Sequence, residues 1–214
     1  MGSLTCLTEP AAVIVADASA VINLNATGCA RDIVTALPNR VAVVDVVATE
    51  LEQGRRRDRQ DADLLNELVA VGLIEVVGLA EPAVQHFEEL VIGPAARTLD
   101  DGEAATIAYA IAHDAIPLVD ERKANRICAE RFPQLRIGCT VDIFTHPEVM
   151  RCLGSETLAG AVFKALYHGR MRVFPHHVEW VLGLIGTQQA ALCTSLPGSV
   201  RLPLAKAAGA KTSS

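Results

Sequence analysis

The most constraining feature of this sequence is one short stretch near its start, VIVADASAVINL, which covers residues 13–24. Its apolar run is too short for a helix but has the length of a strand that is buried on both faces. The run ends at Asp17, and Ser19 follows where a hydroxyl could cap the backbone N–H groups of a new helix. Ligands of parallel α/β sheets bind at the carboxyl ends of the strands, so we expect Asp17 to mark such a site.

The composition allows one domain with a large aliphatic core. The chain has 214 residues, of which 50% are hydrophobic and only 4% aromatic, and its mean hydropathy is +0.30. No apolar run approaches the roughly 18 residues of a membrane span, and we read no signal peptide. The six cysteines are scattered without a CxxC pair, which favours reduced thiols and predicts a cytoplasmic protein with no membrane partner.

The net charge of −6 argues against a broad basic surface for nucleic acid. It does not argue against a site that reaches phosphate groups through a bound metal ion. The motifs GxxxxGK[ST] and GxGxxG are absent, which disfavours nucleotide-cofactor enzymes, and there is no GxSxG nucleophile motif.

Strand-like and helix-like segments alternate along most of the chain. We expect strands over residues 12–17, 40–47, 73–79, 115–120 and 135–140, with helices between them. This alternation predicts an α/β protein in which a parallel sheet of about five strands lies between layers of helices. Two further amphipathic helices are expected over 156–167 and 176–191. The segment 197–214, rich in Ala, Lys, Gly and Ser, is expected to be disordered.

Other carboxylates follow the expected strands in the same way as Asp17. Glu50 follows the second strand, Glu103 begins an Ala-rich helix, and Asp120 ends the fourth strand with Glu121 beside it. If these strands are neighbours, the acids share one crevice, and their mutual repulsion requires a cation or shifted pKa values. Carboxylate oxygens suit Mg²⁺ or Mn²⁺. Each acid also has a simpler interpretation, because acids are favoured in the first turn of a helix and Glu121 could be a solvated neighbour.

Four short motifs resemble those of the PIN domain. They are DAS at 17–19, EL at 50–51, GEA at 102–104 and LVDER at 118–122. The chain is similar in particular to the PIN subgroup with a GEA-type third motif and an (I/V)D(D/E)R fourth motif. The likeness covers about 12–145, and the helices up to about 191 resemble the C-terminal extension of that subgroup. It implies a PIN-like nuclease domain over 1–145 and a helical extension over 146–196 that packs on it.

The resemblance also implies a fold and an activity. PIN domains are α/β/α sandwiches that use Mg²⁺ or Mn²⁺ to cut single-stranded RNA, and many are toxins held in check by an antitoxin protein. Carried over by motif, the catalytic acids are Asp17, Glu50, Glu103 and Asp120. The ion would be held by Asp17, Glu103, Asp120 and Glu121, with Ser19 as a supporting hydroxyl. Many PIN toxins have Thr/Ser-x-Asp at the fourth motif, whereas this chain has the acid first, so either Asp120 or Glu121 could be the fourth ligand.

Two basic segments could guide RNA toward the acids. The first is RRRDR at 55–59, with Arg55 and Arg56 closest to Glu50, and the second is Arg122 with Lys123. A run of charge is equally typical of a solvated face.

Some alternatives stay open. A catalytically inactive PIN-like binding or scaffold protein would keep the same sheet and acids. The apolar stretch Val178–Leu182 could join two copies in a homodimer or pack on its own domain. His176 and His177 are adjacent, but no Cys or carboxylate lies at a matching sequence spacing, so we expect surface or half-buried histidines rather than zinc ligands.

Overall fold

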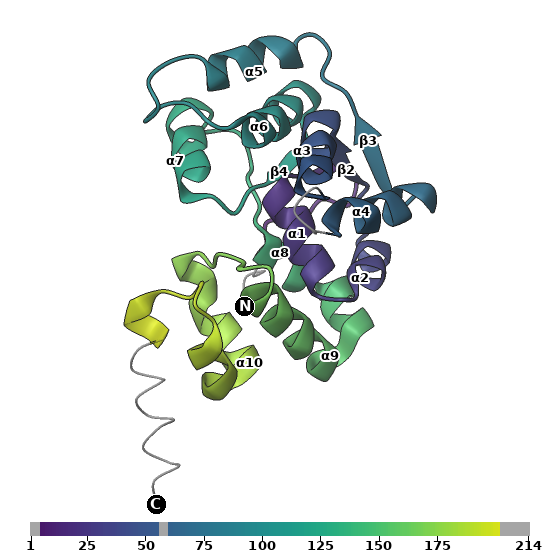
Figure 1. Ribbon diagram of the computed structural model, residues 1–214, viewed down its shortest axis with the longest axis vertical. Helices are drawn as coiled ribbons and strands as arrows, with labels where there is room; N and C mark the ends of the chain where they lie inside the picture. Colours follow the sequence, from purple (N-terminus) through teal and green to yellow (C-terminus); the bar gives the residue numbers. More distant parts are fainter. Residues whose placement is uncertain (1–4, 56–59, 202–214) are drawn as a thin grey trace, which may run out of the picture.

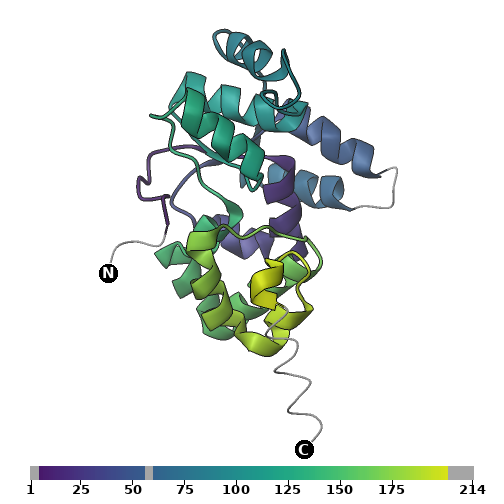
Figure 2. The same ribbon diagram turned by 90° about the vertical axis from the view of Figure 1, so that its left-hand side faces the viewer.

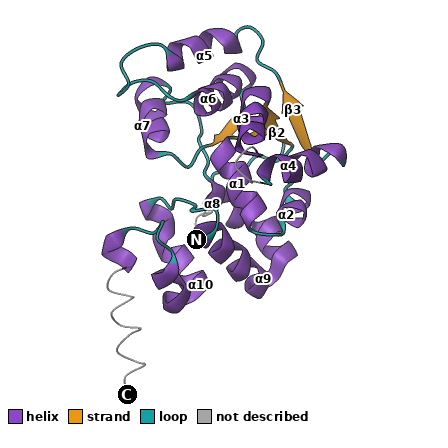
Figure 3. Ribbon diagram, in the orientation of Figure 1, coloured by secondary structure: helices purple, strands orange, loops and turns teal. Residues whose placement is uncertain are grey.

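A four-stranded parallel sheet forms the centre of the protein. The computed structural model describes residues 5–55 and 60–201. Within them the strands are β1 (Ile14–Ala16), β2 (Val41–Val44), β3 (Ile74–Val77) and β4 (Ile116–Leu118), in the order β3-β2-β1-β4. The first strand lies between the second and the fourth, with Ile14 opposite both Val41 and Ile116. The strand ends that carry Asp17 and Asp120 are therefore neighbours. Figure 3 shows strands β2 and β3 in orange among the helices that surround the sheet.

Helices cover both faces of this sheet (Figure 1). In chain order they are α1 (Ala18–Ala26), α2 (Ala30–Ala36), α3 (Asp45–Arg55), α4 (Asp61–Ala70), α5 (Ala83–Val91), α6 (Asp101–His113), α7 (Arg122–Arg131), α8 (Thr140–Phe144), α9 (Pro147–Tyr167) and α10 (Val178–Leu192), with the 3₁₀ turn η1 (Pro175–His177) before the last. The side chains of β1 alternate between the two layers. Ile14 and Ala16 pack with α1, α2 and α9, whereas Val15 packs with the alanines of α6. The predicted α/β/α fold class is confirmed.

The last predicted strand, 135–140, differs in the structure. It contributes only an isolated parallel bridge between Gly138 and Leu118, and helix α8 begins at Thr140. A capping box explains this early helix start: Asp142 accepts a hydrogen bond from the backbone N–H of Cys139 at 2.9 Å. The helix N-terminus therefore lies directly beside the end of β4, where Asp120 follows.

The start of α1 also differs from the sequence interpretation. Asp17, rather than Ser19, is the N-cap residue, and its carboxylate accepts the N–H of Ala20 at 2.7 Å. The hydroxyl of Ser19 donates to the same carboxylate at 2.9 Å. The strand end and the helix cap are thus the same residue, which holds the Asp17 side chain in one orientation.

Helix α9 packs against α1 and α2, and α10 packs on α9, so that both lie together at one end of the molecule (Figure 2). Both are kinked at a glycine with positive φ, Gly154 in α9 and Gly186 in α10. The apolar stretch at the start of α10 packs on its own chain, since Val181 is buried and Trp180 is half-buried against the core. Residues 202–214 of the predicted disordered tail lie outside the described residues. None of the helices described is long and apolar enough to cross a membrane.

Candidate active site

Asp17 and Asp120 lie at the ends of neighbouring parallel strands. Asp17 directly follows β1, and one residue separates Asp120 from the end of β4. The N–H of Asp17 donates to the carbonyl of Leu118. Each aspartate is only 3% exposed. Two carboxylates that are predicted from separate motifs therefore share one buried strand edge.

Asp120 is held by three hydrogen bonds. The N–H of Thr140 donates to its Oδ1 at 2.8 Å, while Thr140 Oγ1 and Asn23 Nδ2 donate to its Oδ2 at 2.6 and 2.7 Å. These bonds favour the charged form, but burial is the larger effect and raises the pKa of Asp120. The sequence interpretation missed both Asn23 and Thr140. The amide of Asn23 within the apolar run of α1 was the one available sign, because a buried polar group needs a partner.

The pKa of Asp17 is also raised, mainly by burial. Burial, and after it the charge of Asp120, raises the pKa of Asp17 to about 8, against the opposing hydrogen bonds from Ala20 and Ser19. A carboxyl group with this pKa is largely protonated at neutral pH unless a cation replaces the proton.

Glu103 joins the pair from the first turn of α6. Burial raises the pKa of Glu103 to about 9, with further contributions from Asp100 through a hydrogen bond and charge, and then from Asp17 and Glu121. Asp100 is the N-cap residue of α6, and the sequence interpretation did not include it in the site. The charges of Asp17 and Glu121 therefore both act on Glu103.

Glu50 approaches this group from another side. It extends from α3 to the N-terminus of α6, where its Oε2 lies 2.5 Å from the position that a Cβ on Gly102 would occupy. Burial and then the charges of Asp100 and Asp101 raise the pKa of Glu50. Glu50 lines a separate hollow with Asp101 and does not line the cleft of Glu103, Asp120 and Glu121. A side chain at position 102 would require the Glu50 carboxylate, the end of a flexible side chain, to move.

Glu103, Asp120 and Glu121 line a cleft of about 660 Å³. Asp17 does not line this cleft but adjoins it through the hydroxyl of Ser19, which does. One wall carries residues from the sandwich, namely Ser19, Asn23, Glu103, Asp120 and Glu121. The other wall is the loop from α9 to η1, which contributes His168, Gly169, Arg170 and Arg172. Arg172 forms an ion pair with Glu121 across the cleft. The sequence interpretation missed this loop, since its bases lie about 50 residues beyond the last acid.

The predicted basic candidates lie elsewhere. Arg122 is exposed and Lys123 half-buried at the start of α7, and neither lines this cleft. Arg56 lies outside the described residues. Arg55 ends helix α3, but its side chain is not among those described.

The donor set fits a hard divalent cation. Every candidate ligand is an oxygen atom of a carboxylate, hydroxyl or amide, as Mg²⁺ and Mn²⁺ prefer. Asn23 Oδ1 is buried at the cleft and has no hydrogen-bond partner among the residues that the structure describes. A cation here would offset the burial and the charge repulsion that together raise the pKa values of Asp17 and Glu103.

These pKa values predict that the stabilising effect of Mg²⁺ grows with pH. Asp17 and Glu103 have ordinary pKa values of 3.8 and 4.5 and folded values of about 8 and about 9. Folding of the metal-free protein therefore takes up protons, and these groups lower its free energy of unfolding as the pH rises from about 4 toward 9. The ion competes with those protons, so the Mg²⁺-induced rise in Tm should be larger at about pH 8 than at about pH 6. Glu103→Gln should flatten this dependence, and an equal rise at both pH values in the unsubstituted protein would contradict the prediction.

Comparison with known proteins identifies the family. A family model described as a PIN domain matches residues 13–186, which includes the sheet, the acids, the basic loop and most of α10. No curated protein and no solved structure matches the chain significantly. The family match extends over most of the sequence and agrees with the parallel sheet and its acidic edge. The chain belongs to the PIN-domain family.

Proposed function

We propose that this protein is a metal-dependent endoribonuclease that hydrolyses phosphodiester bonds of single-stranded RNA, and that it is the toxin of a toxin–antitoxin pair. PIN domains are generally nucleases, which supports the hydrolase class. One observation carries the proposal furthest: Asp17 and Asp120 are both buried at one strand edge, and Asp17 is coupled to Glu103. Carboxylates in such a group are stable together when they hold a cation.

In this proposal each residue has a role. Asp17, Glu103 and Asp120 hold Mg²⁺ or Mn²⁺, and a bound ion supplies hydroxide and neutralises charge on a phosphodiester. Glu121 is the further ligand, and Glu50 contributes negative charge from the α6 side. Ser19, Asn23 and Thr140 orient the aspartates through the hydrogen bonds described above.

The proposal also assigns a role to each of the two parts of the chain. Residues 1–145 supply the acids, and the extension over 146–196 supplies the basic wall of the cleft through Arg170 and Arg172. An antitoxin and a second copy of the chain are proposed partners. Co-purification from a cell that encodes the neighbouring reading frame, together with the mass in solution, would test them.

A cleavage assay tests the function directly. The full chain should cut a mixed single-stranded RNA in the presence of Mn²⁺ or Mg²⁺, and EDTA should stop the reaction. In-line attack by water, with the 3′-oxygen as the leaving group, predicts products with 5′-phosphate ends. Intact RNA in the presence of a bound ion would overturn the proposal and favour a non-catalytic binding protein.

Arg172→Ala should weaken RNA binding without unfolding the protein. Arg172 pairs with Glu121 at the surface of the cleft, and exposed pairs contribute about 0–1 kcal/mol, so its guanidinium can move to a phosphate at little cost. In an Asp17→Asn background, fluorescence anisotropy with labelled RNA should show an affinity several-fold lower, and the slope of log K against log salt should fall by about 1.

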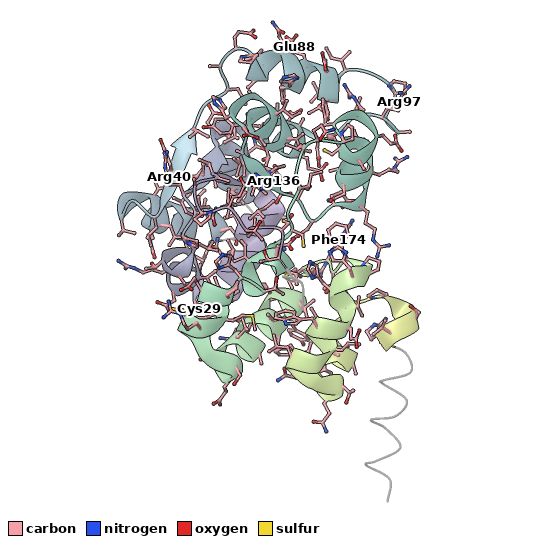
Figure 4. The ribbon with its side chains drawn as sticks, turned by 180° about the vertical axis from the view of Figure 1, so that it is seen from behind. Cys29, Arg40, Glu88, Arg97, Arg136 and Phe174 are labelled. Carbon is pink, nitrogen blue, oxygen red and sulfur yellow. The ribbon has the colours of Figure 1, made fainter. Side chains whose placement is uncertain are left out.

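Arg40→Ala is the matched control for this substitution. It removes another exposed ion pair, with Glu75 at 2.5 Å. In Figure 4 Arg40 lies across the molecule from Phe174, the residue that follows Arg172 by two positions. Arg40→Ala should change neither the affinity nor the salt slope. Equal effects of the two substitutions would contradict a binding role for the loop.

A further inference from the structure

A second cluster of metal-ligating side chains lies apart from the acidic cleft. Cys139, Asp142 and His177 offer a thiol, a carboxylate and an imidazole whose ligand atoms all lie within 4.8 Å of one another. They are 3%, 6% and 1% exposed. None of them lines the cleft that holds Asp120 and Glu103. The proposed nuclease function does not use them.

The separations within this cluster are close to those of a tetrahedral zinc site. Cys139 Sγ lies 3.1 Å from Asp142 Oδ2, and His177 Nε2 lies 3.4 Å from Asp142 Oδ1. Zinc bonds of about 2.0–2.3 Å to oxygen, nitrogen and sulfur place tetrahedral ligands roughly 3.3–3.8 Å apart. Small movements of these side chains would therefore complete the coordination.

The imidazole of His177 lacks the partners that a buried ring needs. Neither Nδ1 nor Nε2 has a hydrogen-bond partner within the described parts of the chain, because the Nε2 contact to Asp142 lies outside hydrogen-bonding geometry. A buried polar group without a partner is unfavourable by about 1–3 kcal/mol. Coordination of a metal ion through Nε2, which lies 3.4 Å from Asp142 Oδ1, would give that nitrogen a partner.

The carboxylate is oriented from two directions. The N–H of Cys139 donates to Asp142 Oδ2 at 2.9 Å, and the N–H of Cys6 donates to Oδ1 at 3.2 Å. Such backbone donors hold a metal ligand in place. Charge also balances, since Zn²⁺ would displace the thiol proton of Cys139 to solvent, and the thiolate and carboxylate would then neutralise the ion.

We propose that Cys139, Asp142 and His177 bind a Zn²⁺ ion that links the C-terminal helices to the sandwich. Three protein ligands leave the fourth tetrahedral position to a water molecule. Cys139 and Asp142 begin α8, whereas His177 ends η1 and leads into α10. Figure 4 shows Phe174, three residues before His177, at the junction between the sandwich and these helices. The neighbouring Thr140 binds Asp120, so the ion would also support the acidic edge.

The spacing of these three residues along the sequence does not indicate a metal site. The interpretation that His176 and His177 are surface or half-buried residues without matching ligands is wrong for His177, which is buried against Asp142. Its partners come from 35 and 38 positions earlier in the chain, and only the packing of η1 on α8 brings them together.

Cobalt(II) distinguishes this site from the acidic cleft, because the cleft contains no cysteine. Under reducing conditions, the full chain titrated with Co²⁺ should show a thiolate-to-cobalt charge-transfer absorption that saturates at one ion per chain. Zn²⁺ binds such donors more tightly and should remove the absorption. An unsubstituted protein that shows no such absorption would overturn the proposal, with no variant required.

Substitutions then assign the ligands. Cys139→Ser should abolish the absorption, and His177→Gln, whose amide can still face Asp142, should weaken Co²⁺ binding by about tenfold or more. Cys193→Ser removes another buried thiol, which donates to the carbonyl of Gln189, and Glu103→Gln alters the acidic cleft; both should retain the absorption. An absorption that survives Cys139→Ser, an unchanged affinity in His177→Gln, or a loss in either control would overturn the assignment.

Discussion

Asp17→Asn is expected to reduce Mn²⁺-dependent RNA cleavage by roughly a thousandfold or more while raising the Tm of the metal-free protein. The loss of activity follows from the position of the carboxylate beside Asp120 and its coupling to Glu103. An amide is a weaker ligand than a carboxylate and does not neutralise the ion.

The gain in stability follows from the same burial. Asp17 has a pKa of about 8 in the folded protein against an ordinary 3.8, so at pH 7 folding must either protonate it or bury its charge beside Asp120. Asparagine avoids this cost and remains a good N-cap, since its side-chain oxygen can accept the N–H of Ala20. We expect a gain of about 1–3 kcal/mol, or about 3–8 °C in Tm.

Melting curves without metal at about pH 4 and about pH 7 check this prediction. The gain should be much smaller near pH 4, because Asp17 is then protonated in the folded state and close to its ordinary pKa of 3.8 in the unfolded state. Asp32→Asn is the control, because Asp32 is an exposed acid in the first turn of α2 and should change neither Tm nor activity. Full cleavage by Asp17→Asn would exclude Asp17 from the site.

Thr140→Val is expected to lower both stability and activity. It removes the hydroxyl that donates to Asp120 Oδ2 at 2.6 Å and leaves a buried carboxylate with fewer donors. Hydrogen bonds to charged groups contribute about 1.5–3 kcal/mol, so the free energy of unfolding should fall by about that amount in the metal-bound protein. Because Thr140 orients a proposed ligand rather than binding the ion, cleavage should fall by about 10- to 100-fold, with a higher Mn²⁺ concentration needed for half-maximal rate.

Thr145→Val is the matched control in the residue that caps the same helix. Thr145 is also buried, but its hydroxyl donates to the neutral carbonyls of Val141 and Asp142. The free energy of unfolding should therefore fall by less in Thr145→Val, about 1 kcal/mol, and the Mn²⁺ dependence of cleavage should be unchanged. If both variants shift the Mn²⁺ dependence alike, Thr140 acts only through the stability of α8.

Most acids of the site could be predicted from the sequence because short segments around each residue identify them. Asp17 and Asp120 each stand where a strand gives way to a helix, and Glu103 stands in the first turn of a helix, all positions that short-range patterns identify. Parallel connectivity then requires the neighbouring strand ends to share an edge. The motifs add a family resemblance, which the family model confirms. The same local reasoning misplaced the α1 cap, since Asp17 and Ser19 are both good capping residues and only the backbone geometry chooses between them.

Hydrophobic periodicity and chain connectivity act over a few residues at a time, so the α/β class, the strand ends and the acids beside them can be predicted from the sequence alone. The long-range contacts of the site depend on tertiary packing. Thr140, Arg172 and His177 reach their partners through the packing of α8 and the C-terminal helices, with 20 to 51 residues between partners. Such contacts depend on how side chains pack between helices and strands, and this packing cannot be predicted from the spacing of residues along the chain.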